Sequence, residues 1–229
     1  MELEKFKYKI NNVSIPFYYK KTSSDTPTYY AKILKGELYK KINFKKKVDI
    51  ILDLGANFGA ASICFAIRHP NSTIISFEPV FETYKILDLN TKNFKSIFTY
   101  NIAASDQDGT ADIYIDKNKL GRSSLFSNHM NFNYNFSEKI NIVNFYSFLR
   151  NNNIEKIDIL KIDVEGSELK IINNIKSFLK NISVIYIEIH GKKRITEVNK
   201  ILSLTHKEIT RDTHNNDLVE SVFINYDLI

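Results

Sequence analysis

Short apolar runs alternate with segments of helical periodicity along most of the chain. Strands that are buried on both faces appear as continuous apolar runs, and helices between them place the strands parallel in one sheet. The predicted strands are 48–54, 73–77, 97–102, 157–162, 183–189, 206–211 and 221–226. The predicted helices between them are 58–69, 79–93, 167–181 and 195–204. This pattern predicts an α/β fold with helices on both faces of the sheet.

The first 47 residues do not follow this alternation and predict a small appendage. The stretch 5–15 has the period of a strand, and 15–20 is expected to pair with it. Thr26-Pro27 marks the start of a helix that we expect to run to about Lys41, since proline is favoured in the first helical turn. A basic loop then leads into the first strand of the sheet.

A second interruption, at about 106–145, predicts a β insertion. The alternating stretches 110–115 and 139–145 are expected to pair with each other. The polar stretch 116–138 between them is too long for an ordinary connection, which favours a lid or an acceptor-binding segment over a plain surface insertion. We therefore expect one domain, 1–229, in which the core 48–229 carries the appendage and the insertion.

Composition and charge narrow the classes of partner. The net charge is +6, but the lysines are spread along the chain, so we do not expect a nucleic-acid binder, and an acidic or phosphorylated substrate fits equally well. No apolar run is long enough for a membrane span, and 1–9 has no signal-peptide core, which favours a cytoplasmic protein. The single cysteine, Cys64, excludes an internal disulfide and is expected to be a buried structural thiol. The oligomeric state stays open, with a homodimer as one alternative.

A glycine turn follows the first strand of the sheet, in the run Asp53-Leu54-Gly55-Ala56-Asn57-Phe58-Gly59. Gly55 allows a tight turn and close approach to a ligand, and Gly59 allows the next helix to pack closely. A dinucleotide fingerprint would have a third glycine, and an aspartate at this position would repel a pyrophosphate. Asp53 instead suits a ligand with positive charge, such as S-adenosylmethionine.

The second strand ends in Phe77-Glu78-Pro79. An acid at this position, about twenty residues beyond the glycine turn, is placed to accept hydrogen bonds from the two hydroxyl groups of a ribose. The alternative interpretation of Glu78 is an acid that only assists the start of the following helix. The spacing from Gly55 favours the ribose contact.

Acidic residues and a histidine lie at the carboxyl ends of the next two predicted strands. Asp163 follows a buried strand, while Glu165 and Glu168 are equally well explained as residues that stabilise the start of a helix. His190 ends the neighbouring strand and could act as a general base. The two strand ends meet at one edge of the sheet, so Asp163 and His190 are the candidate catalytic residues. Asp163 could instead hold a divalent cation, and the sequence leaves that alternative open.

These motifs together resemble the FkbM family of methyltransferases. The resemblance covers roughly residues 34–190, and its most specific part is Lys161-Ile162-Asp163-Val164-Glu165-Gly166-Ser167-Glu168. It implies a Rossmann-like class I methyltransferase sheet with strand order 3-2-1-4-5-7-6, in which strand 7 is antiparallel. It also implies S-adenosylmethionine as the methyl donor and O-methylation of a small molecule or glycan, commonly a sugar hydroxyl.

The resemblance also implies roles for individual residues. The donor's methionine part would lie on Asp53, Gly55, Ala56, Asn57 and Gly59, and its ribose on Glu78 beside Pro79. Its adenine would lie on Asn101-Ile102-Ala103-Ala104. Arg122 and Ser123 lie in a stretch that resembles the family's serine-rich segment, and we expect them, with Glu165, to contact the acceptor. One departure is Asn144-Phe145, where family members often have Leu-Asp.

Two other functions compete with methyl transfer. An NAD-dependent sugar oxidoreductase is disfavoured by the missing third glycine and by Asp53. A non-catalytic nucleotide- or RNA-binding module is disfavoured because no RNA-stacking motif is present and the acids at the sheet edge would repel phosphates. An O-methyltransferase must align a hydroxyl with the donor methyl group, and a base that accepts the hydroxyl proton would assist the transfer.

Overall fold

The central sheet of the computed structural model has the strand order expected from the resemblance. The structure describes residues 3–10, 13–21, 26–115, 123–125 and 136–228. Within these ranges the sheet has seven strands, in the order β11-β12-β10-β9-β3-β4-β5. Their bounds are β3 Ile50–Leu54, β4 Thr73–Phe77, β5 Ile97–Tyr100, β9 Ile157–Ile162, β10 Ile182–His190, β11 His206–Asn215 and β12 Leu218–Asn225. Since β12 runs antiparallel to both of its neighbours, the predicted order 3-2-1-4-5-7-6 is confirmed.

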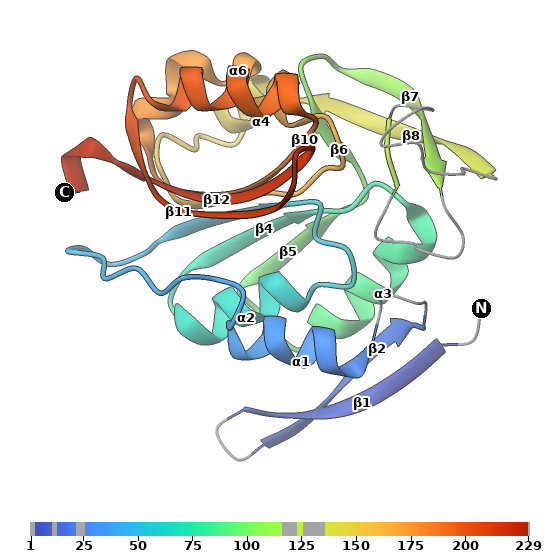
Figure 1. Ribbon diagram of the computed structural model, residues 1–229. Coiled ribbons are helices and arrows are strands. Elements are labelled where there is room, and N and C mark those ends of the chain that lie inside the picture. Colours follow the sequence, from blue (N-terminus) through green and yellow to red (C-terminus); the bar gives the residue numbers. More distant parts are fainter. Residues whose placement is uncertain (1–2, 11–12, 22–25, 116–122, 126–135, 229) are drawn as a thin grey trace.

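Helices cover both faces of this sheet (Figure 1). One face carries α1 (Pro27–Lys35), α2 (Ala60–Arg68) and α3 (Phe81–Thr91), and the other carries α4 (Phe145–Asn151), α5 (Glu168–Asn174) and α6 (Lys192–Leu202). Successive residues of β3 belong to different hydrophobic clusters, Ile51 to one and Leu52 to the other. Strand β9 is buried along its whole length. Burial on both faces explains the continuous apolar runs in the sequence.

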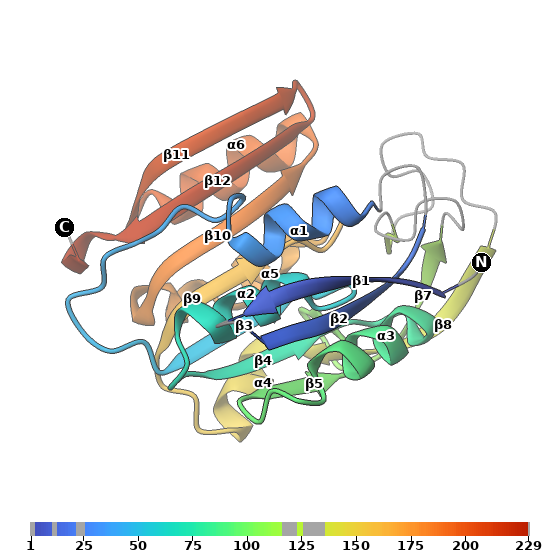
Figure 2. The same ribbon diagram turned by 90° about the horizontal axis from the view of Figure 1, so that it is seen from below.

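The N-terminal segment forms a hairpin and a helix on one face of the core. Strands β1 (Leu3–Ile10) and β2 (Val13–Lys20) pair antiparallel, so the predicted strand 5–15 is wrong in its bounds. The hairpin lies over α1 and α3 (Figure 2), and the Asn90 side chain on α3 bonds the backbone N–H and C=O of Tyr18. Helix α1 ends at Lys35, earlier than predicted, because Gly36 adopts a left-handed conformation (φ 74°) and its N–H closes the last turn.

The β insertion forms a separate three-stranded sheet in the order β6-β8-β7. Strands β7 (Gly109–Ile115) and β8 (Phe136–Asn144) pair antiparallel, which confirms the predicted pairing. The observed strand β5 is shorter than the predicted strand 97–102. The chain leaves the central sheet after Tyr100 and continues as β6 (Ala103–Ser105) in the second sheet. Most of 116–138, including Arg122, lies outside the described residues, so the lid hypothesis remains a prediction.

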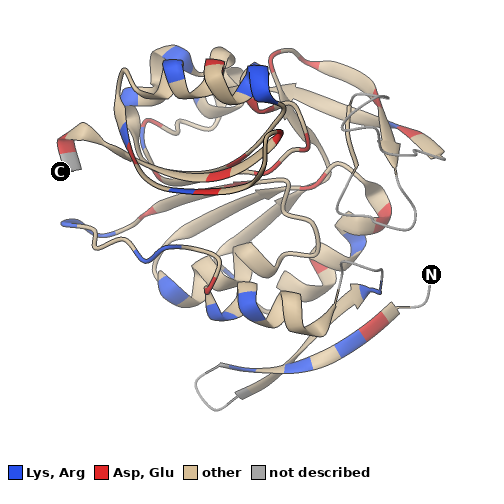
Figure 3. Cartoon of the chain, viewed as in Figure 1, with Lys and Arg blue, Asp and Glu red and all other residues tan. Residues whose placement is uncertain are grey.

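Other expectations can be compared with the described residues. The predicted helix 167–181 is divided into α5 and a 3-10 helix, Lys176–Asn181. A 3-10 helix, Tyr226–Leu228, also follows the last strand. Cys64 is buried as expected, and burial raises its pKa to about 11. None of the described helices is long and apolar enough to cross a membrane. Basic side chains occur on the hairpin, on α1 and on α6 rather than in one patch (Figure 3).

Candidate active site

The glycine turn after β3 is held against two neighbouring strands. The N–H groups of Gly55 and Ala56 both donate to the Phe77 carbonyl, at 3.0 and 2.9 Å. Gly55 has φ 78°, and a Cβ at this position would lie 1.7 Å from the Asp163 carbonyl oxygen. Only glycine fits here, as the sequence predicted. A Cβ on Gly59 would collide with Leu87 on α3, so this glycine serves helix packing rather than ligand contact.

A cavity opens at the carboxyl ends of β3, β4 and β9, and we call it the first cavity. Nine of the predicted site residues line it: Gly55, Asn57, Glu78, Pro79, Ala103, Ala104, Ser123, Asp163 and Glu165. Phe77, Ile102, Ile113, Leu125, Val164 and Ser167 complete its wall. The predicted site residues Asp53, Ala56, Gly59, Asn101 and His190 are not part of this wall. Asn101 supports it from behind, because its amide donates to the carbonyls of Glu78 and Pro79, both at 2.9 Å.

Glu78 is fixed at the end of β4 by two backbone N–H groups. Its Oε2 accepts from Asn57 and its Oε1 from Val80, both at 3.0 Å. Burial raises its pKa to about 7, although these two hydrogen bonds act in the opposite direction. Each carboxylate oxygen keeps a further lone pair, which suits a pair of ligand hydroxyl groups on the cavity side.

Asp53 is fully buried behind the first cavity and is neutralised by a residue that the sequence analysis did not single out. Lys161 Nζ lies 3.0 Å from Asp53 Oδ1 and 3.5 Å from Asp163 Oδ2, and it donates to the Gly55 carbonyl at 2.9 Å. Burial would lower the pKa of Lys161, but Asp53 and Asp163 raise it well above its ordinary value. The expected attraction of Asp53 for a cationic donor is therefore weakened, and Asp53 acts on the glycine turn through Lys161.

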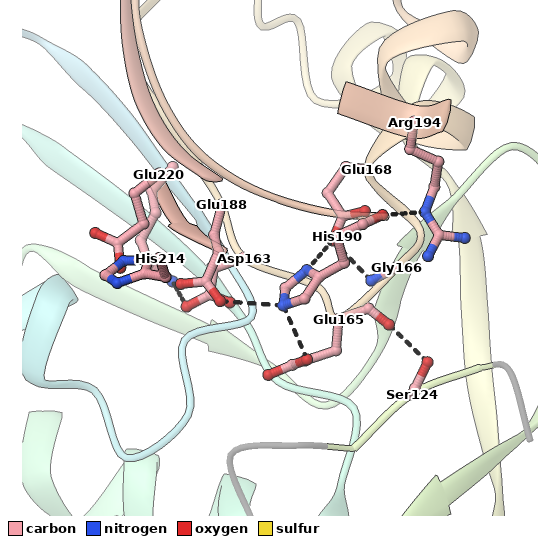
Figure 4. A network of polar contacts seen from close by, with 11 residues as sticks. Ser124, Asp163, Glu165, Gly166, Glu168, Glu188, His190, Arg194, His214 and Glu220 are labelled. Atoms are coloured by element: carbon pink, nitrogen blue, oxygen red, sulfur yellow. Dashed lines mark hydrogen bonds and ion pairs between the residues drawn. The ribbon is translucent and has the colours of Figure 1, made fainter. Parts of the chain in front are cut away.

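His190 is held in a cage of carboxylates (Figure 4). Its Nδ1 lies 2.9 Å from Glu168 Oε1, and its Nε2 lies 3.1 Å from both Glu165 Oε2 and Glu188 Oε1. Burial would lower the pKa of His190, but these three contacts outweigh it and raise the pKa far above its ordinary value. An imidazolium at neutral pH cannot accept a proton, so this geometry argues against the predicted general-base role.

Asp163 separates the first cavity from a second one. The second cavity measures about 560 Å³ and lies between the segment after α1 and strands β9 to β12. Its wall includes Tyr29, Glu37, Leu38, Tyr39, Lys40, Lys161, Asp163, Tyr186, Glu188, Arg211, Asp212 and Glu220. The Asp163 side chain is 36% exposed, so it can contact a ligand in either cavity. Partial desolvation of the carboxyl group and the nearby Glu188 raise its pKa to about 8, against the opposing effect of Lys161.

Two buried oxygen atoms in the wall of the first cavity lack a hydrogen bond to the described residues. Among the described residues, neither Asn57 Oδ1 nor Ser167 Oγ has a hydrogen-bond partner. Buried polar atoms are nearly always hydrogen-bonded in folded proteins, so two unpaired oxygens in one cavity wall are consistent with a bound ligand or water there. A ligand with hydroxyl groups for Glu78, a flat ring for the apolar wall and a polar tail for Asn57 and Ser167 would satisfy this cavity. S-adenosylmethionine has all three parts.

Sequence comparisons find methyltransferases. A family model described as "Methyltransferase FkbM domain" matches residues 53–211. The methyltransferase sdnD of Sordaria araneosa is 25% identical over 82% of this chain and 89% of its own length. The hexuronic acid methyltransferase AglP of Haloferax volcanii is 23% identical over 75% of this chain and 69% of its own length.

Comparisons with solved structures support the fold. The methyltransferase FkbM from Methylobacillus flagellatus KT has a TM-score of 0.53 and 13% identity, over 87% of this chain. The matched region spans 50% of that protein's chain. The fibrillarin of Aeropyrum pernix, whose structure contains S-adenosyl-L-methionine, has a TM-score of 0.51 and 10% identity over 96% of this chain and 82% of its own. At these identities the similarity establishes a shared Rossmann-like fold.

Proposed function

The chain belongs to the FkbM methyltransferase family, and from this premise we propose that it transfers the methyl group of S-adenosylmethionine to a hydroxyl group of a sugar or of a sugar-containing surface-polysaccharide precursor. The observation that carries the proposal is the position of Asp163 in the shared wall of the two cavities. A donor in the first cavity and an acceptor in the second would meet at this carboxylate. The relative AglP is described as a hexuronic acid methyltransferase, which supports a sugar acceptor.

The donor is proposed to lie along the first cavity with its ribose on Glu78. Its adenine would lie against the apolar wall that includes Phe77, Ile102 and Leu125. Its methionine part would extend over the Gly55 turn toward Asn57 and Ser167, whose buried oxygens could accept hydrogen bonds from the ammonium group. This arrangement directs the sulfonium methyl group toward Asp163.

The acceptor is proposed to lie in the second cavity, where polar and aromatic side chains occur together. Carboxylates such as Glu220 can accept hydrogen bonds from sugar hydroxyls, and Tyr39 and Tyr186 offer apolar ring surface to a sugar ring. In the transfer step the acceptor oxygen attacks the methyl carbon, a carbon–oxygen bond forms and the carbon–sulfur bond breaks. The hydroxyl proton passes to Asp163, and S-adenosylhomocysteine is released. In this mechanism His190 positions the acidic residues rather than acting as the base.

Ligand binding tests the donor part of this proposal. Calorimetry should show one site for S-adenosylhomocysteine per chain, and no comparable binding of NAD or of a short RNA. If the wild-type protein binds NAD, and the Asp163→Asn variant binds NAD equally well, the oxidoreductase alternative would be favoured. Acceptors can then be screened by formation of S-adenosylhomocysteine with methyl glycosides of neutral sugars and of uronic acids. Methylation of an acceptor amine or carbon instead of a hydroxyl would contradict the proposed reaction.

A further inference from the structure

A mixed group of nitrogen and oxygen donors lies beside Asp163, between the two cavities. The ligating atoms of Glu165, Glu188 and His190 all lie within 4.8 Å of one another. The three side chains come from two strand ends, Glu165 after β9 and the other two at the end of β10. Figure 4 shows both glutamates directed toward the imidazole from different sides.

The orientation of the imidazole leaves one ring nitrogen directed toward both glutamates. Glu168 Oε1 lies 2.9 Å from Nδ1 and accepts from the Gly166 N–H at 2.7 Å, so it is itself fixed. Nε2 is therefore the nitrogen directed toward Glu165 and Glu188. In metal sites, a carboxylate on the second ring nitrogen commonly fixes the tautomer and the ring orientation of a histidine ligand.

The spacing of the donor atoms fits a cation. Octahedral ions with bond lengths of about 2.1 Å hold neighbouring ligand atoms roughly 3 Å apart. Glu165 Oε2 and Glu188 Oε1 are each 3.1 Å from Nε2. An imidazolium ion pair has the same spacing, so distance alone does not choose between a proton and a metal ion.

The charge around the imidazole favours a doubly charged ion over a proton. Four carboxylates, those of Asp163, Glu165, Glu168 and Glu188, lie at or beside this histidine. Of the described cations, Lys161 contacts Asp163 and the buried Asp53, and Arg194 donates to the His190 backbone carbonyl. Because four carboxylates surround one imidazole, a doubly charged ion on Nε2 would interact with them more strongly than a single proton does. A bound divalent cation would be the largest local charge at this position.

We propose that Glu165, Glu188 and His190 Nε2 bind a divalent cation of the Mn²⁺ or Mg²⁺ class at the boundary of the two cavities. Glu165 lines the first cavity and Glu188 the second, so an ion held between them would have coordination positions open to solvent and to ligands. Three protein ligands with open positions are typical of catalytic metal sites rather than closed structural ones. The inference concerns ion binding and does not rest on the proposed methyl transfer.

The test uses the full chain, treated with chelator and then titrated with Mn²⁺ alone, without methyl donor or acceptor. Electron paramagnetic resonance and calorimetry should both give one bound Mn²⁺ per chain, and Mg²⁺ should compete with it. Glu188→Gln and His190→Gln should each abolish this binding. Glu168→Gln, which removes only the carboxylate behind the histidine, should weaken it about 10–100-fold.

The exposed pair His214–Glu220, also separated by 2.9 Å, offers a matched control. His214→Gln should leave Mn²⁺ binding unchanged, because the described residues show no third ligand at that pair.

Thermal unfolding checks that each variant is folded. If His190→Gln fails to fold, Glu188→Gln still decides the matter, since the Glu188 side chain is 23% exposed. Wild-type protein that binds no Mn²⁺, Mg²⁺ or Zn²⁺, or a Glu188→Gln variant that binds as well as wild type, would overturn the proposal and leave an imidazolium cage. Wild-type protein that binds Mn²⁺ but not S-adenosylhomocysteine would count against the proposed function and would leave the proposed ion site standing.

Discussion

Lys161 and Asp53 form a buried ion pair across adjacent parallel strands, with 3.0 Å between Nζ and Oδ1. The register of β9 and β3 pairs these two residues directly. Asp53 Oδ2 also accepts from the Ser62 hydroxyl at 2.6 Å, and Lys161 reaches the Gly55 carbonyl. The pair therefore connects the interior of the sheet to the turn that shapes the first cavity.

Replacement of Lys161 by methionine should destabilise the fold strongly. The variant leaves the buried Asp53 carboxylate without its counter-charge, and breaking a buried pair in this way costs about 3–5 kcal/mol. Urea unfolding followed by circular dichroism would measure the change. The double variant Asp53→Asn with Lys161→Met should recover part of the loss, and Lys47→Met, from the exposed pair with Asp49, should have no measurable effect. A Lys161→Met variant as stable as wild type would contradict this view of the pair.

Glu78→Ala should weaken binding of S-adenosylhomocysteine. Hydrogen bonds to a charged acceptor are each worth about 1.5–3 kcal/mol, so the loss of even one corresponds to roughly a 10- to 150-fold higher Kd. Calorimetry on wild type and variant gives the ratio directly. Glu82→Gln, an exposed acid on the following helix, is the control and should bind like wild type. Equal affinity in Glu78→Ala and wild type would remove Glu78 from the donor site.

The pH dependence of stability should carry a contribution from Glu78. Burial raises its pKa in the folded protein to about 7, whereas the ordinary value is 4.5. Between these values the unfolded chain releases the proton and the folded chain keeps it, so this group makes unfolding easier as the pH rises. Relative to Glu78→Gln, the wild-type free energy of unfolding should fall from about pH 4.5 to about pH 7 and stay level above that. A difference that is constant over this range would show that the pKa of Glu78 is not raised.

Much of the fold could be predicted because its strands are buried on both faces. The apolar runs at 73–77 and 157–162 match β4 and β9 to the residue. The strand β6 was missed because Ala103–Ser105 is too short to show a strand period. Its formation depends on pairing with the distant β8. The early end of α1 at Gly36 depends on a left-handed glycine that the sequence analysis passed over.

The sequence could predict which site residues lie at the strand ends, but not which charged side chains form ion pairs with them. Position alone indicates that Glu78 and Asp163 reach the carboxyl edge of the sheet, because parallel strands end there together. The partner of Asp53 depends on strand register, which one chain does not reveal. The signal was Lys161, a lysine inside the buried strand β9, whose other polar residue is Asp158 at its start. The environment of His190 depends on three carboxylates that approach it from two strand ends, so its isolated position in the sequence gave a different expectation.

The Asp163→Asn variant should separate chemistry from donor binding. Asparagine has nearly the same shape and can still face Lys161, but it cannot accept the acceptor's hydroxyl proton. We therefore expect the variant to bind S-adenosylhomocysteine about as tightly as wild type. The rate at which it methylates the acceptor should fall about 10²–10⁴-fold. The matched control is Asp212→Asn, a second acid of the second cavity, which should raise KM more than it lowers kcat because it lies away from the shared wall. Wild-type turnover in Asp163→Asn would show that positioning of the two substrates, without this carboxylate, is sufficient for the transfer.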